Sequence, residues 1–119
     1  MTRFLLVCLA GAVGSGLRYL VVEWADRWGV LAINIGGSFL IAIVSVIALA
    51  RVDAMSDTTR LVLSAGFLGG FTTYSSFNQA TLKLLDERAY ASAFSYVALT
   101  LVGCLLAGVA GTVIAKRLS

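Results

Sequence analysis

At residues 66–78 the chain reads Gly66-Phe-Leu-Gly-Gly-Phe-Thr-Thr-Tyr-Ser-Ser-Phe-Asn78. Glycines, hydroxyl side chains and aromatic rings are crowded there, inside an apolar run long enough to cross a membrane. Irregular backbone at membrane depth is tolerated only where protein or a water-filled cavity satisfies its N–H and C=O groups. Interrupted membrane helices are also where transporters place ion and substrate sites. This segment therefore predicts a broken membrane helix with a site for an ion or a small substrate.

The composition is that of a membrane protein. Of the 119 residues, 60% are hydrophobic and 13% are charged, and the mean hydropathy is +0.96. A soluble domain of this length buries only about two-thirds of its unfolded surface, which is too little to hide so many apolar side chains. The net charge of +3 comes from basic residues scattered at the ends of apolar runs. That pattern argues against a nucleic-acid partner and for a lipid bilayer.

Four apolar runs are each long enough, at about 20 residues, to cross a hydrocarbon core of roughly 30 Å as helices. Short polar connectors separate them, so consecutive helices are expected to be antiparallel. We predict an all-α membrane protein, with one four-helix transmembrane domain over residues 1–119 and a third helix broken mid-membrane. It is expected to be a multi-pass protein of the cell inner membrane. The predicted spans are residues 4–22, 30–50, 61–85 and 91–115.

The basic residues on the two sides of the predicted domain are nearly balanced. One side carries Arg3, Arg51, Arg60, Lys116 and Arg117, and the other carries Arg27, Lys83 and Arg88, with Arg18 nearby. Orientation follows the Lys/Arg bias of short loops, so a balanced chain is expected to insert both ways round. Small residues four apart, such as Gly66 and Gly70, let helices approach closely in lipid. We therefore expect the chain to pair with itself as an antiparallel, dual-topology dimer.

Two polar residues lie within the first two runs, and each has two interpretations. Arg18 is four residues from the end of its run, where a long basic side chain can snorkel to the headgroups. Alternatively, it forms an electropositive vestibule that attracts an anion. Asn34 can hydrogen-bond a neighbouring helix, or its amide can offer two donors to an anion.

The third run carries the strongest functional pattern. Gly69-Gly70 can unwind a helix and expose carbonyls that suit a hard cation such as Na⁺. Hydroxyls follow at Thr72, Thr73, Ser75 and Ser76. Tyr74 and Phe77 are three residues apart and project from one helix face. Because aromatic ring edges are positive, two rings presented edge-on can replace part of an anion's hydration. Ordinary aromatic packing is the alternative, and the neighbouring glycines and hydroxyls favour a functional role.

The fourth run contains one polar stripe. Tyr96, Thr100 and Cys104 follow each other at four-residue spacing on an otherwise apolar helix. The stripe is either a seam between helices or the lining of a narrow aqueous path, and the spacing does not distinguish them.

The sequence offers nothing typical of an enzyme. It contains no histidine, and every Asp and Glu lies in or beside a connector. Neither a catalytic triad nor a mid-membrane carboxylate for proton coupling is present. We therefore expect a protein that is not an enzyme and that moves its ion passively.

The chain resembles the Fluc (CrcB) family of fluoride channels over its whole length. The resemblance rests on Gly14-x-x-x-Arg18, on Gly29-x-x-x-x-Asn34-x-x-Gly37, and most specifically on Gly69-Gly-Phe-Thr-Thr-Tyr-Ser-Ser-Phe77. It implies four-helix subunits that assemble as antiparallel homodimers with two fluoride pores. It also implies a structural Na⁺ at the centre of the dimer. The expected function is fluoride-selective export down the electrochemical gradient, which confers fluoride resistance.

Residue roles follow from the resemblance by position. The expected fluoride path is lined by Asn34, Tyr74, Phe77, Tyr96, Thr100 and Cys104, to which we add the Ser75 hydroxyl. Arg18 matches the basic residue near the vestibule, and the backbone carbonyls of Gly69 and Thr72 match the Na⁺ ligands. The chain departs from the family at Ala80, where an acidic residue is usual. This departure bears on conductance rather than on the fold.

Other functions remain open at this point. A small multidrug resistance-type exporter shares the length, the four spans and the dual topology, but it needs a Glu within the first span. A non-conducting membrane subunit or assembly factor would tolerate the loss of Asn34 or Phe77. A heterodimer with a paralogue is the alternative to a homodimer.

Overall fold

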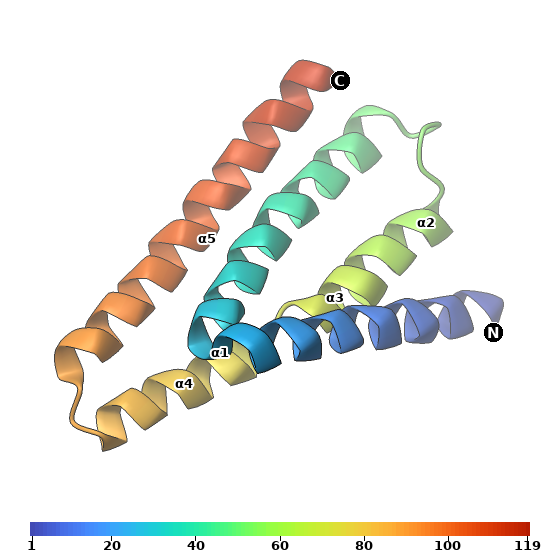
Figure 1. The fold of residues 1–119 in the computed structure, drawn as a ribbon. Helices are drawn as coiled ribbons and strands as arrows, with labels where there is room; N and C mark the ends of the chain where they lie inside the picture. Colours follow the sequence, from blue (N-terminus) through green and yellow to red (C-terminus); the bar gives the residue numbers. More distant parts are fainter.

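The computed structural model describes residues 1–119 and is entirely helical (Figure 1). Its α-helices are α1 (Thr2–Ala50), α2 (Asp57–Leu61), α3 (Gly69–Phe71), α4 (Tyr74–Asp86) and α5 (Tyr90–Leu118). A π-helix, η1 (Val62–Leu68), joins α2 to α3. No strand is present, which confirms the predicted all-α class.

Helix α1 contains both of the first two predicted spans. The connector expected at residues 23–29 is helical except at Asp26, whose φ of 50° and ψ of −133° interrupt the helix. The chain changes direction sharply at this residue, so the two halves of α1 form an angle (Figure 1). One non-helical residue therefore makes the turn for which the sequence predicted a seven-residue connector.

The third predicted span is broken, but not at its glycine pair. Gly69 and Gly70 are helical within α3, whereas Thr72 (φ −83°, ψ 156°) and Thr73 (φ −154°, ψ 120°) are extended. The expectation that Gly69-Gly70 unwinds the helix was therefore wrong. Threonine side chains can hydrogen-bond nearby backbone and so replace helical bonds. Here the Thr73 hydroxyl does so by accepting the Ser76 N–H, which stabilises the break two residues after the glycines.

The glycines instead allow close packing of helices. The first half of α1 lies against η1 and α3, and a Cβ on Gly14 would come closer than 3.0 Å to the Phe67 carbonyl oxygen. A Cβ on Gly70 would meet the Gly11 carbonyl in the same way. The second half of α1 lies between α5 and the segment from α2 to α3 (Figure 1). The second half of α1 therefore lies beside both α5 and the broken segment, and these three parts of the chain together form the candidate site described below.

Little of the chain is buried within itself. Only 15 of 119 residues are buried, and the main cluster is Val30, Phe77, Leu84, Ala93 and Tyr96. Large apolar side chains are exposed along α1 and α5. By length and composition these two helices can each cross a membrane. The count of four spans and the antiparallel dimer stay predictions.

Candidate functional site

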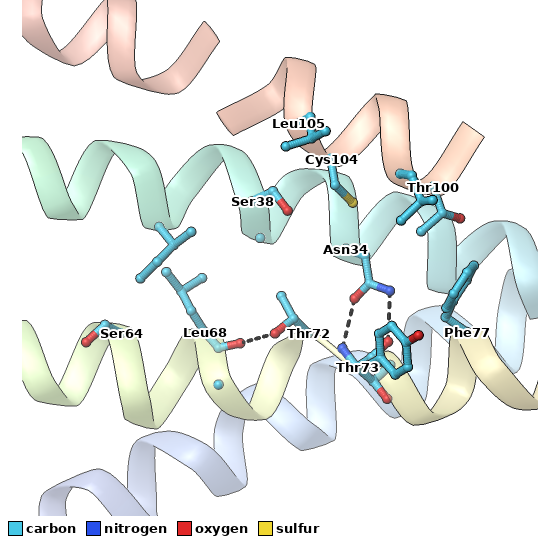
Figure 2. A pocket seen from close by; sticks show the side chains of 15 residues that line it. Asn34, Ser38, Ser64, Leu68, Thr72, Thr73, Phe77, Thr100, Cys104 and Leu105 are labelled. Carbon is cyan, nitrogen blue, oxygen red and sulfur yellow. Dashed lines mark hydrogen bonds between the residues drawn. The ribbon is translucent and has the colours of Figure 1, made fainter. Parts of the chain in front are cut away.

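An open groove of about 630 Å³ lies between the second half of α1, the break before α4, and α5 (Figure 2). Its lining has three parts. Helix α1 provides Asn34, Gly37, Ser38 and Ile41. The broken segment provides Ser64, Leu68, Gly69, Thr72, Thr73, Tyr74 and Phe77. Helix α5 provides Thr100, Leu101, Cys104 and Leu105. No lining side chain carries a formal charge, so the groove combines neutral polar groups with apolar walls.

The groove brings together most of the predicted site residues. Those that line it are Asn34, Gly69, Thr72, Tyr74, Phe77, Thr100 and Cys104. Ser75 and Tyr96 contact lining residues without lining the groove themselves. Arg18 lies in the first half of α1 and is not part of the lining.

Asn34 is hydrogen-bonded to the backbone at the helix break. Its Nδ2 donates to the Thr73 carbonyl at 2.8 Å, and its Oδ1 accepts the Thr73 N–H at 2.8 Å (Figure 2). Because the partners are a carbonyl and an N–H, they fix which end of the amide is oxygen. An asparagine amide has two N–H donors, so one of them is not used by Thr73. Both roles considered from the sequence, a bond to a neighbouring helix and a donor for an anion, are thus compatible with this one side chain.

The Thr73 side chain caps the helix that follows the break. Its Oγ1 accepts the Ser76 N–H at 3.1 Å, as an N-cap residue does, and lies within hydrogen-bond distance of the hydroxyls of Ser75 and Ser76. Thr73 is 8% exposed, so little water competes for these bonds. The predicted path residue Ser75 therefore bonds to the cap rather than lining the groove.

Two carbonyls at the break lose the donors that a continuous helix would supply. In an α-helix the N–H of residue i donates to the carbonyl of residue i−4. The Gly69 carbonyl would thus accept the Thr73 N–H, which donates to Asn34 instead. The Thr72 carbonyl would accept the Ser76 N–H, which donates to the Thr73 hydroxyl instead. The two carbonyls predicted to bind a cation are therefore among those that lose a helical donor at the break.

Aromatic rings form a contiguous group at the end of the groove nearest α4. The Phe77 ring lies 5.5 Å from the Tyr74 ring at 61° and 5.5 Å from the Tyr96 ring at 27°. Phe77 is 6% exposed, whereas Tyr74 is 75% exposed. The Tyr96 hydroxyl donates to the Arg27 carbonyl at 3.2 Å, near the turn within α1. Tyr96 therefore supports the Phe77 ring and directs its own hydroxyl to the backbone.

The polar stripe of α5 continues into the groove. Thr100 and Cys104, one turn apart, both line it. The Thr100 hydroxyl donates to the Tyr96 carbonyl at 2.8 Å, one turn earlier on the same helix. Thr100 and Cys104 therefore both lie on the groove, and their role in lining an ion path stays a prediction.

Two other sequence features lie outside the groove. Arg18 is partly buried, and its Nε is buried without a hydrogen-bond partner. Ala80 is partly buried and packs against the cluster that contains Phe77. A side chain at this position therefore acts on the aromatic group indirectly, through its packing.

The sequence analysis did not select Gly37, Ser38 or Thr73 as site residues. Gly37 is one turn beyond Asn34, so both occupy the same face of α1. A Cβ on Gly37 would lie closer than 3.0 Å to the Thr72 methyl group. The Asn34-x-x-Gly37 spacing could have predicted this close approach, because a polar residue and a glycine on one helix face are typical of a close contact between helices.

Known proteins resemble this chain over essentially its full length. The family model described as "CrcB-like protein, Camphor Resistance (CrcB)" matches residues 5–112. A protein of Anaeromyxobacter sp. (strain K) is 46% identical over 100% of this chain and 99% of its own length. A protein of Sorangium cellulosum is 44% identical over 99% of this chain and 98% of its own length. A protein of Geobacter sulfurreducens is 42% identical over 99% of this chain and 100% of its own length. All three relatives are named fluoride-specific ion channel FluC. With a match over most of its length and relatives of this similarity, the chain belongs to the CrcB family.

Proposed function

We propose that this chain is a subunit of a fluoride-selective channel that exports fluoride passively across the cell inner membrane. The groove is the observation that carries the proposal. It places one unused amide N–H of Asn34, the ring of Phe77 and the polar side chains of α5 along one neutral surface. The names of the relatives identify fluoride as the ion that such a surface would conduct.

The lining suits a small, strongly hydrated anion. A selective pore must replace the hydration shell with directed donors while binding weakly enough for the ion to leave. The amide N–H and the positive edges of aromatic rings are such donors, and none of them adds a formal charge. Phe77 is held between Tyr74 and Tyr96, so its ring orientation is fixed before an ion arrives. Selectivity against larger anions then follows from the width of the groove and the positions of these donors.

Passive flow follows from the same lining. No Asp, Glu, Lys or Arg side chain lines the groove. A proton-coupled transporter uses such a group within the membrane to carry protons. Fluoride would therefore move down its electrochemical gradient without proton coupling.

We further propose that two chains assemble as an antiparallel homodimer with two pores. The nearly balanced basic residues at the span ends allow insertion in both orientations. The large apolar side chains left exposed provide surface for a second copy as well as for lipid.

A central Na⁺ fits the helix break of this chain. The Gly69 and Thr72 carbonyls lack their helical donors, and carbonyl oxygen is a ligand that hard cations accept. When bound, Na⁺ would supply positive potential beside the anion path without a titratable side chain.

Fluoride efflux from liposomes containing the purified protein tests the proposal, with chloride efflux measured in parallel. We expect rapid fluoride release without chloride release. Asn34→Asp should abolish release because it removes the amide donor, and Phe77→Ile should do so because it removes the ring edge. Absence of fluoride release from wild-type protein that elutes as a single folded species would contradict the proposed channel.

A further inference from the structure

We infer that Asn34 is a positioning residue for the cation site as well as a donor in the anion groove. The inference rests on the proposed function and deepens it. One amide holds the helix break open on one side and retains an N–H for the groove on the other. The cation carbonyls and the anion path are thereby linked through a single side chain.

The first step concerns the Gly69 carbonyl. Its helical donor would be the Thr73 N–H, which lies 2.8 Å from Asn34 Oδ1. The reciprocal bond from Nδ2 to the Thr73 carbonyl, also 2.8 Å, holds this arrangement from both ends of the amide. Buried polar groups are costly to leave unpaired, so without Asn34 the Thr73 N–H would return to the Gly69 carbonyl. Asn34 thus keeps the Gly69 oxygen free for a cation without touching that oxygen.

The second step concerns the Thr72 carbonyl. Its helical donor, the Ser76 N–H, is taken by the Thr73 hydroxyl at 3.1 Å. Thr73 holds that position because Asn34 binds its backbone on both sides. The freed carbonyls of Gly69 and Thr72 therefore both depend on the Asn34–Thr73 contact.

The two tasks of Asn34 can be separated by substitution. Asn34→Asp keeps an oxygen that accepts the Thr73 N–H, but it loses the bond to the Thr73 carbonyl and has no N–H to offer the groove. Asn34→Ala removes both functions. At Thr73, Thr73→Ser keeps the hydroxyl that accepts the Ser76 N–H, and the nearly isosteric Thr73→Val removes it. The four variants form two matched pairs.

The experiment measures thermal unfolding of each purified full-length variant in detergent, with Na⁺ or with an impermeant organic cation in its place. A ligand that binds only the folded state raises the melting temperature. We expect Na⁺ to raise it equally in the wild type and Thr73→Ser, and by at least half of that amount in Asn34→Asp, which keeps the bond to the Thr73 N–H but loses the bond to its carbonyl. The rise should fall below half of the wild-type value in Asn34→Ala and Thr73→Val. Fluoride efflux, measured on the same preparations, should be lost in Asn34→Asp although this variant still responds to Na⁺.

The outcomes distinguish this inference from the proposed function. A full Na⁺ response in Asn34→Ala would overturn the positioning role, and a full response in Thr73→Val would overturn the step through the Thr72 carbonyl. A wild type that conducts fluoride but does not respond to Na⁺ would overturn the positioning role too, and would leave the channel standing. A wild type that responds to Na⁺ but conducts no fluoride would refute the channel, while the variants still decide the role of Asn34. If Asn34→Ala does not fold, the Na⁺ responses of the two Thr73 variants decide the positioning role.

Discussion

Replacing Gly37 with alanine tests whether the Asn34 face of α1 sets the geometry of the helix break. A Cβ at this position would lie closer than 3.0 Å to Thr72 Cγ2, whereas carbon atoms in contact are about 3.5–4.0 Å apart. The Thr72 side chain cannot turn away freely, because its hydroxyl donates to the Leu68 carbonyl at 3.0 Å. The added Cβ therefore has one of two effects. Either the Thr72–Leu68 hydrogen bond is lost, or the extended segment at Thr72 and Thr73 moves away from α1. The second effect would stretch the two 2.8 Å hydrogen bonds between Asn34 and Thr73.

The magnitude follows from these bonds. Each hydrogen bond contributes about 0.5–1.5 kcal/mol net, and overpacking typically costs about 1–3 kcal/mol. Alanine offsets part of this, because it favours a helix over glycine by about 1 kcal/mol. The free energy of unfolding should therefore fall by only about 1 kcal/mol. A rise of about 1–2 kcal/mol in the barrier for ion passage would slow fluoride efflux by about 5–30-fold.

The assay is fluoride efflux from liposomes for Gly37→Ala, Thr72→Ser and the double variant. Thr72→Ser removes the obstructing methyl group and keeps the hydroxyl that bonds to Leu68. We expect the double variant to recover most of the wild-type rate, with a coupling energy of about 1–2 kcal/mol. Gly36→Ala is the matched control, because nothing lies within 4 Å of its added Cβ. Wild-type efflux in Gly37→Ala, or no rescue by Thr72→Ser, would refute the reasoning.

Two further predictions concern stability. Gly14→Ala should lower the free energy of unfolding by about 1–3 kcal/mol, because its Cβ would meet backbone atoms of η1 and α3. Gly16→Ala is the control and should leave stability unchanged, because nothing lies within 4 Å of its added Cβ. Equal thermal stability of the two variants would contradict the proposed packing. Tyr96→Phe should cost about 1 kcal/mol through the lost bond to the Arg27 carbonyl and leave fluoride efflux near the wild-type rate. A large loss of efflux with unchanged stability would instead place the Tyr96 hydroxyl in the ion path.

The helical class and the interruption of the third span were predictable from the sequence because both are local properties. Apolar runs of about 20 residues are typical of membrane helices, and glycine and hydroxyl residues are known to weaken them. The position of the break was not predictable in the same way. The sequence predicted that the helix would break at Gly69 and Gly70, but both residues are helical within α3. Thr72 and Thr73 open the chain because their alternative hydrogen-bond partners include a residue of another helix.

The candidate site was predictable as a set of residues but not as an arrangement. Nothing local indicates that Asn34 meets Thr73, because 39 residues separate them along the chain. The contact depends on how α1 turns at Asp26 and on the close approach that Gly37 permits. Sequence reasoning therefore found the donor and the break, and only the fold shows that they are joined.

The structure shows hydrogen bonds for the hydroxyl side chains that the sequence analysis did not predict. The sequence analysis placed Thr100 in the fluoride path, yet the hydroxyls of Thr72 and Thr100 each donate to the carbonyl one turn earlier. Such bonds are the usual choice of Ser and Thr within helices. The carbonyl that Thr100 uses can also accept a helical N–H, so its hydroxyl can turn toward an anion without leaving the carbonyl unpaired.

Such an exchange would let the proposed groove bind fluoride and still release it. Giving up the neutral hydrogen bond to the carbonyl costs about 0.5–1.5 kcal/mol, which offsets part of the bond gained to the anion. A donor that has an internal partner therefore binds the ion less tightly than a donor with none. The second N–H of Asn34 has no such partner, so together with the neighbouring Phe77 ring it should form the strongest binding position. From there the ion would pass to the weaker position at Thr100, which returns its hydroxyl to the backbone when the ion leaves.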